Sequence, residues 1–309
     1  MELIPRQTNI DFMRFRCIAA LISLTLISFS LYLWFSKGDS KYGVDYRGGH
    51  EVVVKIGGEA EADNIRSALT KDGFEDAIVQ SFEQGSSQYS IRVGDLPGLG
   101  DTKAVRDKIE AVLKAAFSDQ VEILKTDYVG PTIGAELRVR GLIAVSVGLL
   151  AMLLYITFRF ELAFGIGAVV AVFHDVIIST GGYLLAGHTL NGASLAAALT
   201  IVGYSVYDTV VIFDRVREEI LRHRDFELAQ LLNEAVNAML SRTIITHMLT
   251  FFSVLALLLF GGGAISDLSL FLVVGVLSGS YSTIFIASPV ALAWNTFRNR
   301  SQAKVALAS

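Results

Sequence analysis

The chain has 309 residues, of which 52% are hydrophobic and 18% charged, and its formal net charge is −4. Its mean hydropathy is +0.52. A soluble globular protein carries about a quarter charged residues and lacks long uncharged runs, so this composition excludes an ordinary soluble domain. The single cysteine, Cys17, excludes an internal disulfide.

Six stretches are apolar over about 17–25 residues, the length that a helix needs to cross a hydrocarbon core of ~30 Å. The sequence therefore predicts six transmembrane helices, at 17–35, 139–157, 161–186, 190–212, 244–261 and 268–293. The first stretch follows Arg14 and Arg16, as the apolar core of a secretory signal would. It is too long for a cleavable core, and no small-residue cleavage site follows it, so we expect it to remain as the first span.

Apart from the long segment 36–137, the basic residues of the connections and chain ends fall on one side of the predicted membrane. They precede span one, lie between spans two and three and between spans four and five, and follow span six: Arg6, Arg14, Arg16, Arg159, Arg215, Arg217, Arg222, Arg224, Arg242, Arg298, Arg300 and Lys304. The short loops "GHTLNG" and "GGGAISD" contain neither Lys nor Arg. The positive-inside rule then predicts that residues 1–16 and 297–309 are cytoplasmic and that 36–137 is exported.

The exported segment alternates between strand-like and helix-like patterns. Strands are predicted at 50–56, within 74–83, at 87–93 and at 120–129, and helices at 59–73 and 101–117, with a turn at Gly85-Ser86-Ser87. The order β-α-β-β-α-β predicts a ferredoxin-like α+β domain. Acidic residues outnumber basic ones in this segment, and the basic residues form no stripe. Both observations argue against nucleic-acid binding.

The longest predicted cytoplasmic connection, 213–243, contains an amphipathic pattern. Apolar residues recur there at three- and four-residue intervals, with polar residues between them: Leu228, Leu231, Leu232, Ala235, Val236 and Met239. This pattern favours a helix that lies along the cytoplasmic face of the membrane. A helix packed only on its own bundle is an equally good interpretation.

Four ionisable side chains fall inside the predicted spans: His174, Asp175, Asp208 and His247. A charge in hydrocarbon costs at least a few kcal/mol, so such groups usually face a bundle interior or a water path.

Asp208 ends a polar stripe on span four that includes Tyr204 and Ser205, its neighbours one turn earlier. Span five carries a second stripe, in which Thr246 and His247 follow Thr243. Two such stripes predict facing helix surfaces that line a hydrated track.

Asp208 is suited to carrying a proton. Burial favours a neutral carboxyl group and a nearby cation favours the charged one, so a carboxyl that meets Arg242 in only one arrangement would change its proton affinity between arrangements. Protonation would then select a conformation. The alternative is that Asp208 only bonds a neighbouring helix.

The other intramembrane groups leave alternatives open. His174 and Asp175 are adjacent, so their side chains point roughly 100° apart on a helix and only one can face a given path. For this pair, a structural role and a functional role both stay open. For His247, a structural role is favoured.

The enzyme signatures that can be checked are missing. "HEVVV" at 50–54 lacks the second histidine of a zinc-binding helix, and the chain has no phosphate-binding loop of the G-x-x-x-x-G-K type. No nucleophile has an evident base partner. The sequence therefore favours a protein without catalytic activity.

Several motifs together resemble the SecF family of the bacterial protein-export machinery. They are "DFMRFR" (11–16), "GVDYRGG" (43–49), "VGPTIGAEL" (129–137), "FHDVIISTG" (173–181), "GYSVYDTVVIFDRVRE" (203–218) and "SRTIITH" (241–247). They occur in the family's order and cover nearly the whole chain. Each motif is weak alone, and the set is highly specific.

The resemblance implies a six-span fold of the resistance-nodulation-division (RND) superfamily in the bacterial inner membrane, with a periplasmic ferredoxin-like domain. It implies pairing with SecD and association with the SecYEG channel, YajC and YidC. It further implies use of the proton-motive force, without a bound cofactor, to help unfolded preproteins across the membrane. Asp208 and Arg242 match family residues tied to proton conduction, and His174 and Asp175 match a pair whose role is less defined.

Two other functions stay open at this point. One is half of a proton-driven RND exporter of small molecules, although exporters of that class usually carry larger extramembrane domains. The other is a purely structural assembly subunit, in which Asp208 would not titrate.

Overall fold

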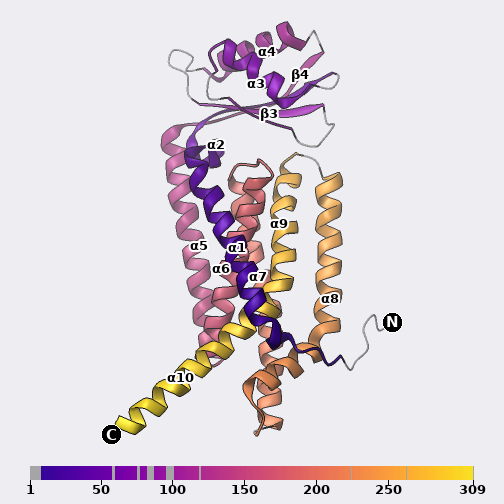
Figure 1. The fold of residues 1–309 in the computed structure, drawn as a ribbon. Helices are drawn as coiled ribbons and strands as arrows, with labels where there is room; N and C mark the ends of the chain where they lie inside the picture. Colours follow the sequence, from indigo (N-terminus) through magenta and orange to yellow (C-terminus); the bar gives the residue numbers. More distant parts are fainter. Residues whose placement is uncertain are drawn as a thin grey trace.

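A computed structural model of the chain describes residues 8–57, 60–74, 77–81, 87–94, 101–117, 120–223, 225–261 and 263–308. Within this part of the chain, six helical segments are long and apolar enough to cross a membrane. They form a bundle that carries a small sheet domain at one end, while α1 begins and α10 ends toward the other (Figure 1). The predicted fold class is thereby confirmed. Arg6, Arg224 and residues 85 and 86 of the predicted turn lie outside the described residues.

The bundle has a buried centre and an exposed periphery. Its spans are α1 (Arg16–Ser36), α5 (Pro131–Arg159), α6 (Leu162–Leu185), α7 (Gly192–Arg222), α8 (Leu228–Phe260) and a last span of three consecutive parts, α9 (Gly263–Ser282), the π-helical turn η3 (Thr283–Ala287) and α10 (Ser288–Ala308). About half of the most apolar part of α6, α7 and the last span is buried, against less than a fifth in α1, α5 and α8. The polar intramembrane groups lie mostly on the central helices.

The last span approaches α6 closely at its π-helical turn. A β-carbon added at Gly167 would lie 2.5 Å from the carbonyl oxygen of Ala287, so only glycine permits this contact. Single π-turns inside α-helices are rare and frequently occur at functional sites. Here the turn directly follows Ser282, which belongs to the polar cluster described below.

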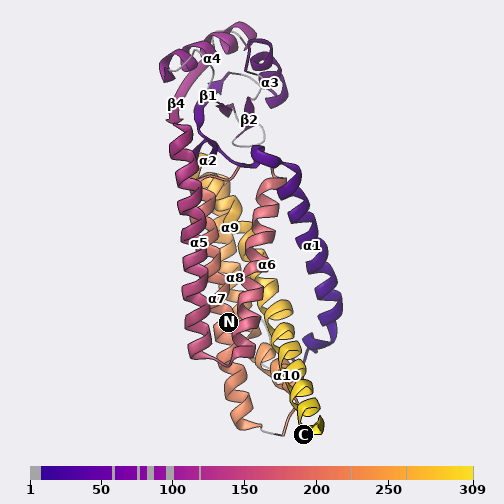
Figure 2. The ribbon, with the colours of Figure 1, turned by 90° about the vertical axis from the view of Figure 1, so that its left-hand side faces the viewer.

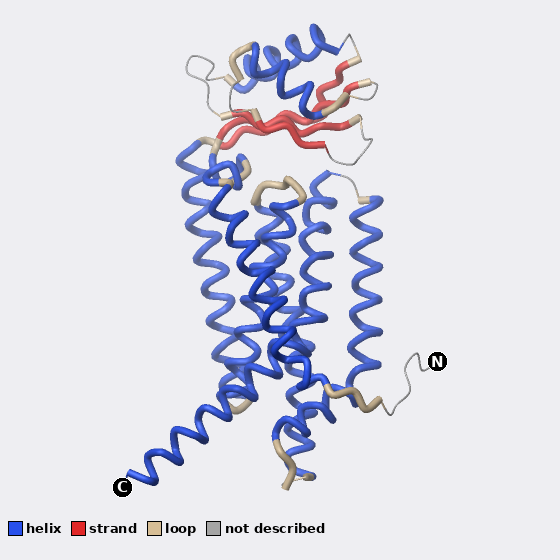
Figure 3. Tube along the Cα trace, viewed as in Figure 1, coloured by secondary structure: helices blue, strands red, loops and turns tan. Residues whose placement is uncertain are grey.

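The sheet domain has the predicted element order. It consists of β1 (Gly49–Ile56), α3 (Ala62–Lys71), β2 (Ile78–Ser81), β3 (Gln88–Val93), α4 (Thr102–Phe117) and β4 (Val121–Val129). The strands are antiparallel in the order β2-β3-β1-β4. Helices α3 and α4 cover the face turned away from the bundle (Figure 3). The core between them is fully buried at Val52, Ile65, Ile91 and Ile109.

Two consecutive glycines connect the bundle to the sheet. Gly48 and Gly49 have φ values of +82° and +118°, which a residue with a β-carbon rarely adopts. A β-carbon on Gly49 would also lie 2.4 Å from the carbonyl oxygen of Val93. They follow the short helix α2 (Val44–Arg47), which packs on the start of α5. The motifs "GVDYRGG" and "VGPTIGAEL" are therefore packed against each other at this connection.

A polar network holds the face of the sheet that is turned toward the bundle. Arg92 of β3 donates through Nη1 to Thr189 Oγ1 at 2.5 Å, in the loop between α6 and α7. The Nδ1 atom of His188 lies 2.6 Å both from Gln80 Nε2 of β2 and from Asp267 Oδ1 of α9. The sheet is therefore fixed to the bundle through two of its strands.

The connection predicted at 213–243 is shorter than expected. Helix α7 continues to Arg222 and α8 begins at Leu228, so only residues 223–227 separate them. The apolar face of the amphipathic segment packs into the bundle core, where Leu232, Ala235 and Val236 are fully buried. The segment is thus the start of a span packed on its own bundle, because its apolar face already has protein to cover it.

The polar residues of that segment bind the start of the chain. The side-chain oxygens of Asn233 and Asn237 accept hydrogen bonds from the backbone NH groups of Met13 and Ile10, each at 3.0 Å. Their side-chain NH2 groups donate to Asp11 Oδ1 and to the carbonyl oxygen of Ile10, each at 2.8 Å. The N-terminal segment that contains "DFMRFR" is therefore held against α8.

Candidate functional site

Two buried carboxylates lie on neighbouring central helices, Asp175 on α6 and Asp208 on α7. Their side chains are no more than 7% exposed. Since an apolar span gains nothing from burying an acid, each carboxylate needs partners that offset its desolvation. Asp175 and Asp208 differ sharply in the number of such partners.

Asp175 is surrounded by donors. One carboxylate oxygen accepts from Ser278 Oγ at 2.6 Å and lies 3.0 Å from His174 Nδ1. The other accepts from Ser205 Oγ at 2.7 Å and from Ser282 Oγ at 2.6 Å. With four partners from α6, α7 and α9, this carboxylate joins three helices at one point.

His174 bonds its neighbour rather than pointing away from it. Its Nδ1 faces Asp175, and its Nε2 lies 3.0 Å from Ser23 Oγ on α1. Ser23 in turn donates to Tyr281 Oη at 3.2 Å. The helical angle between adjacent residues suggested that only one of the pair could face a path. The imidazole instead turns back toward the carboxylate, so both groups belong to one polar chain.

Among the described residues, Asp208 makes one ion-pair contact, with His247 of α8. The Nδ1 atom of His247 lies 3.0 Å from Asp208 Oδ2. This approach lacks hydrogen-bond geometry, and among the described residues that oxygen has no hydrogen-bond partner. The same Nδ1 also lies 3.3 Å from the carbonyl oxygen of Thr243. His247 therefore lies directly against Asp208, whereas the sequence favoured a structural role for this histidine.

Arg242 lies away from Asp208. Its Nη2 donates to Tyr207 Oη at 3.3 Å, and both side chains are on the exposed side of α7 and α8. Arg242 precedes His247 by five residues, which on a helix turns it well away from the face that His247 presents to Asp208. The arrangement in the structure is thus one in which the arginine and the acid are apart.

The two predicted polar stripes meet at only part of their length. The ring of Tyr204 packs edge-on against His247, with centroids 5.2 Å apart. Thr246 instead donates to carbonyl oxygens of its own helix, at residues 242 and 243. Ser205 of α7 donates a hydrogen bond to Asp175 of α6. Because Ser205 also lies one turn from Asp208 on α7, the two acids share one polar face.

Sequence reasoning missed the residues of the last span that complete the site. They are Ser278, Ser282 and Tyr281, together with Thr283, whose hydroxyl lies 3.3 Å from Thr209 Oγ1. The signal was present in "SGSYST" at 278–283, a run of hydroxyl groups inside an apolar span. Hydroxyl side chains cost little in a helix because they can bond their own backbone, so the run did not indicate a site by itself.

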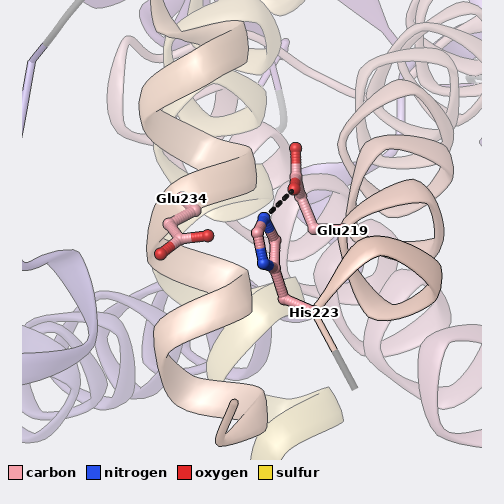
Figure 4. A group of neighbouring side chains, drawn as sticks. All are labelled: Glu219, His223 and Glu234. Carbon is pink, nitrogen blue, oxygen red and sulfur yellow. Dashed lines mark ion pairs between the residues drawn. The ribbon is translucent and has the colours of Figure 1, made fainter. Parts of the chain in front are cut away.

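A second cluster of ionisable groups lies at the far ends of α7 and α8. Ligand atoms of Glu219, His223 and Glu234 lie within 4.8 Å of one another, close enough for a metal ion (Figure 4). The carboxylate of Glu219, however, already pairs with Arg215 at 2.5 Å and lies 3.7 Å from Arg222. A cation would have to displace these arginines, so the cluster is an ion-pair network.

The geometry defines a class of protein: a polytopic membrane protein with an α+β domain outside the bundle and a buried cluster of aspartate, histidine and hydroxyl side chains within it. The family model "Protein export membrane protein SecD/SecF, C-terminal" matches residues 108–297. The subunit SecF of the protein translocase from Rickettsia akari is 35% identical, with 94% of this chain and 93% of the relative covered. That of Calditerrivibrio nitroreducens is also 35% identical, over 97% of this chain and 99% of the relative.

Solved structures agree with these relatives. The crystal structure of SecDF, a translocon-associated membrane protein from Thermus thermophilus, superposes with a TM-score of 0.85 at 32% identity and covers 95% of this chain. A structure of SecDF in a super-membrane-facing form gives a TM-score of 0.71. The chain spans 40% of the first SecDF chain. The chain belongs to the SecD/SecF family of protein-export membrane proteins, with a SecF-like role in protein translocation.

Proposed function

We propose that the chain uses the proton-motive force to assist the late translocation and release of preproteins across the bacterial cytoplasmic membrane, in cooperation with the SecYEG channel. The observation that carries the proposal is the buried Asp208, whose one ion-pair contact among the described residues is with His247. An acid that lacks hydrogen-bond donors at such a depth is stabilised by binding a proton. The energy source is then the gradient itself, and no bound cofactor is required.

Proton transfer can select between two arrangements of the bundle. In the arrangement described above, Asp208 faces His247 and Arg242 faces Tyr207. A second arrangement, in which Arg242 approaches the carboxylate, would favour the charged acid. A proton entering or leaving would shift the population between the two, and only this difference in affinity can drive the motion.

The partner in this scheme is SecD. The exposed side of α7 and α8 carries Tyr207 and Arg242 together with exposed apolar residues, among them Met248 and Phe252. A second six-span core packed there would bury this face and supply a further acid. YajC and YidC would join the same assembly. We further propose that both termini are cytoplasmic and that the sheet domain is periplasmic, as the distribution of basic residues indicates.

The decisive experiment replaces Asp208 with asparagine, which keeps the size of the side chain and removes its titration. Pulse-labelled export of a periplasmic protein is measured in cells in which the variant is the only copy. We expect export to fall to the rate of cells that lack the gene. Asp214→Asn is the matched control, since Asp214 lies on the same helix but is about half exposed and pairs with Arg159.

If Asp208→Asn supports export at the rate of the unaltered chain, the proton role is excluded and the structural-subunit alternative gains support. Arg242→Met tests the second arrangement separately. We expect a comparable export defect, although Arg242 touches only Tyr207 in the structure. Export equal to that of the unaltered chain would exclude the pairing of Arg242 with Asp208.

A further inference from the structure

An apolar cavity opens between α1, α5, α6 and α7 in the half of the bundle nearest the sheet domain. Its volume is about 620 Å³, within the range of ~300–1,000 Å³ that is typical of small-molecule sites. Figure 2 shows α1 and α5 on either side of α6, the helix whose Val176, Ile177 and Thr180 line the cavity. Small residues, Gly141 of α5 and Ala198 of α7, leave the space unfilled.

The walls of the cavity are open to the surrounding hydrocarbon. Leu31 of α1 and Leu142 of α5 line it, and they are 40% and 70% exposed. A mostly apolar space that is open at this depth is filled by what the bilayer supplies, because it offers water few hydrogen-bond partners. The chemistry of the lining therefore fits an acyl chain.

The rim toward the sheet domain carries aromatic rings and cations. Lys41 Nζ lies 4.6 Å from the ring centroid of Trp34, and the guanidinium carbon of Arg138 lies 5.2 Å from that of Tyr42. Tryptophan and tyrosine concentrate where acyl chains meet headgroups. Among the residues that the structure describes, no carboxylate lies within ion-pair distance of Lys41 or Arg138.

We propose that this cavity is a binding site for one phospholipid of the leaflet beside the sheet domain. One acyl chain occupies the cavity, and the phosphate binds the exposed Arg138 at the rim. The proposal rests on charge complementarity: Arg138, which has no ion-pair partner among the described residues, lines a mostly apolar space beside the ring of Tyr42. This site is separate from the Asp208 cluster and does not depend on the proposed proton role.

The bound lipid would contact both connections between the sheet domain and the bundle. Tyr42 and Tyr46, next to and within α2, line the cavity from one side, and Arg138 and Val139 line it from α5. The lipid thereby completes the packing at the junction from which the sheet domain projects.

The test measures lipid retention by the full-length chain, purified with any co-expressed partner, by native mass spectrometry. The probes are dioleoyl phosphatidylglycerol and dioleoylglycerol, which share their acyl chains and differ in the phosphate. We expect one phosphatidylglycerol to be retained per chain, with dioleoylglycerol retained roughly tenfold less, as the loss of a charge-assisted contact implies.

Two pairs of variants separate the headgroup contact from the cavity. Arg138→Gln should lower phosphatidylglycerol retention roughly tenfold, whereas Arg140→Gln, on the same helix but paired with Glu136 at 2.5 Å, should not. Val145→Phe, which fills the cavity, should lower retention of both lipids. Ile143→Phe, at an exposed position outside the lining, should leave retention unchanged.

Equal retention by Arg138→Gln and the unaltered chain would overturn the headgroup assignment, and equal retention of the two lipids by the unaltered chain would do the same. Equal retention by Val145→Phe and Ile143→Phe would overturn the cavity assignment. Thermal unfolding checks that each variant is folded. If Val145→Phe does not fold, the arginine pair still decides the proposal, because neither arginine is buried.

Discussion

The two intramembrane acids have opposite surroundings. Asp175 accepts hydrogen bonds from Ser205, Ser278 and Ser282 and is fully buried. Asp208 lies beside His247 with no such donors at the oxygen that faces the imidazole. Hydroxyl donors from α7 and α9 meet at the carboxylate of Asp175 on α6, so we infer that Asp175 holds these three helices together.

Asp175→Asn is therefore expected to destabilise the protein. The amide keeps one acceptor oxygen and places an NH2 group against hydroxyl donors, so the bonds from α7 and α9 must rearrange. Loss of a buried charged partner costs about 3 kcal/mol, which thermal unfolding of the purified chain would detect. Ser280→Ala is the control, because Ser280 donates only to Val276 of its own helix. An unchanged melting temperature for Asp175→Asn would contradict its organising role.

Helical spacing predicted part of the candidate site. It placed Tyr204, Ser205 and Asp208 on one face of span four, and the structure has Ser205 and Asp208 on the polar side of α7. It could not predict that His247, rather than Arg242, lies against Asp208. Periodicity fixes the face of each helix, but the rotation and height of one helix against another depend on packing across the whole bundle.

At the scale of single elements, α6 and the last span make a close contact that involves the backbone. Gly167→Ala would place a methyl group 2.5 Å from the backbone oxygen of Ala287, which cannot move like a side chain. We expect destabilisation by about 2 kcal/mol, the cost of overpacking a tight interface. Gly203→Ala is the matched control.

Gly203 lies in the interior of α7 with nothing within 4 Å of an added β-carbon. Alanine there should be neutral or stabilise the chain by up to about 1 kcal/mol, because it restricts the unfolded backbone. Chemical denaturation in mild detergent would compare the two variants. Similar stabilities would mean that the contact at Ala287 relaxes without cost.

The connection between spans four and five shows the limit of element prediction. Apolar length indicates where a helix can cross a membrane but not where it stops, so α7 and α8 continue well into the predicted loop 213–243. The pattern at 228–239 correctly indicated a helix with one apolar face. It could not tell membrane from protein as the cover for that face, because both are apolar.

At the scale of the whole molecule, the βαββαβ order and the six spans followed from the sequence because each depends on local pattern. The docking of the sheet onto the bundle did not. It depends on Arg92, His188 and Asp267, which are far apart in the sequence and carry no periodic signal. Polar contacts of this kind become visible only when both parts have been placed.

The junction of the two parts should weaken in alkali. Tyr46, only 9% exposed, donates to the carbonyl oxygen of Asn191, and burial raises its pKa from 10.0 to about 12, with the nearby Asp45 adding to the shift. A raised pKa means that the unfolded chain loses this proton first. The stabilisation is present below pH 10 and is lost as the pH rises toward 12.

The loss amounts to up to about 2 kcal/mol. Melting temperatures measured between pH 8 and 11.5 should fall more steeply for the unaltered chain than for Tyr46→Phe, which has no proton to lose at this position. Parallel slopes would show that the Tyr46 hydroxyl is not protected by the fold.

The asparagine side chains of α8 that hold residues 10–13 have a mechanical consequence. Helix α8 is hydrogen-bonded to the backbone that leads into α1, so a displacement of α8 would also displace the start of α1. Because α1 ends just below the sheet domain, this one helix connects the contact with α8 to the opposite side of the bundle (Figure 1). A rearrangement around His247 can therefore act on the sheet-domain side of the molecule through α1, without any change in the buried centre of the bundle.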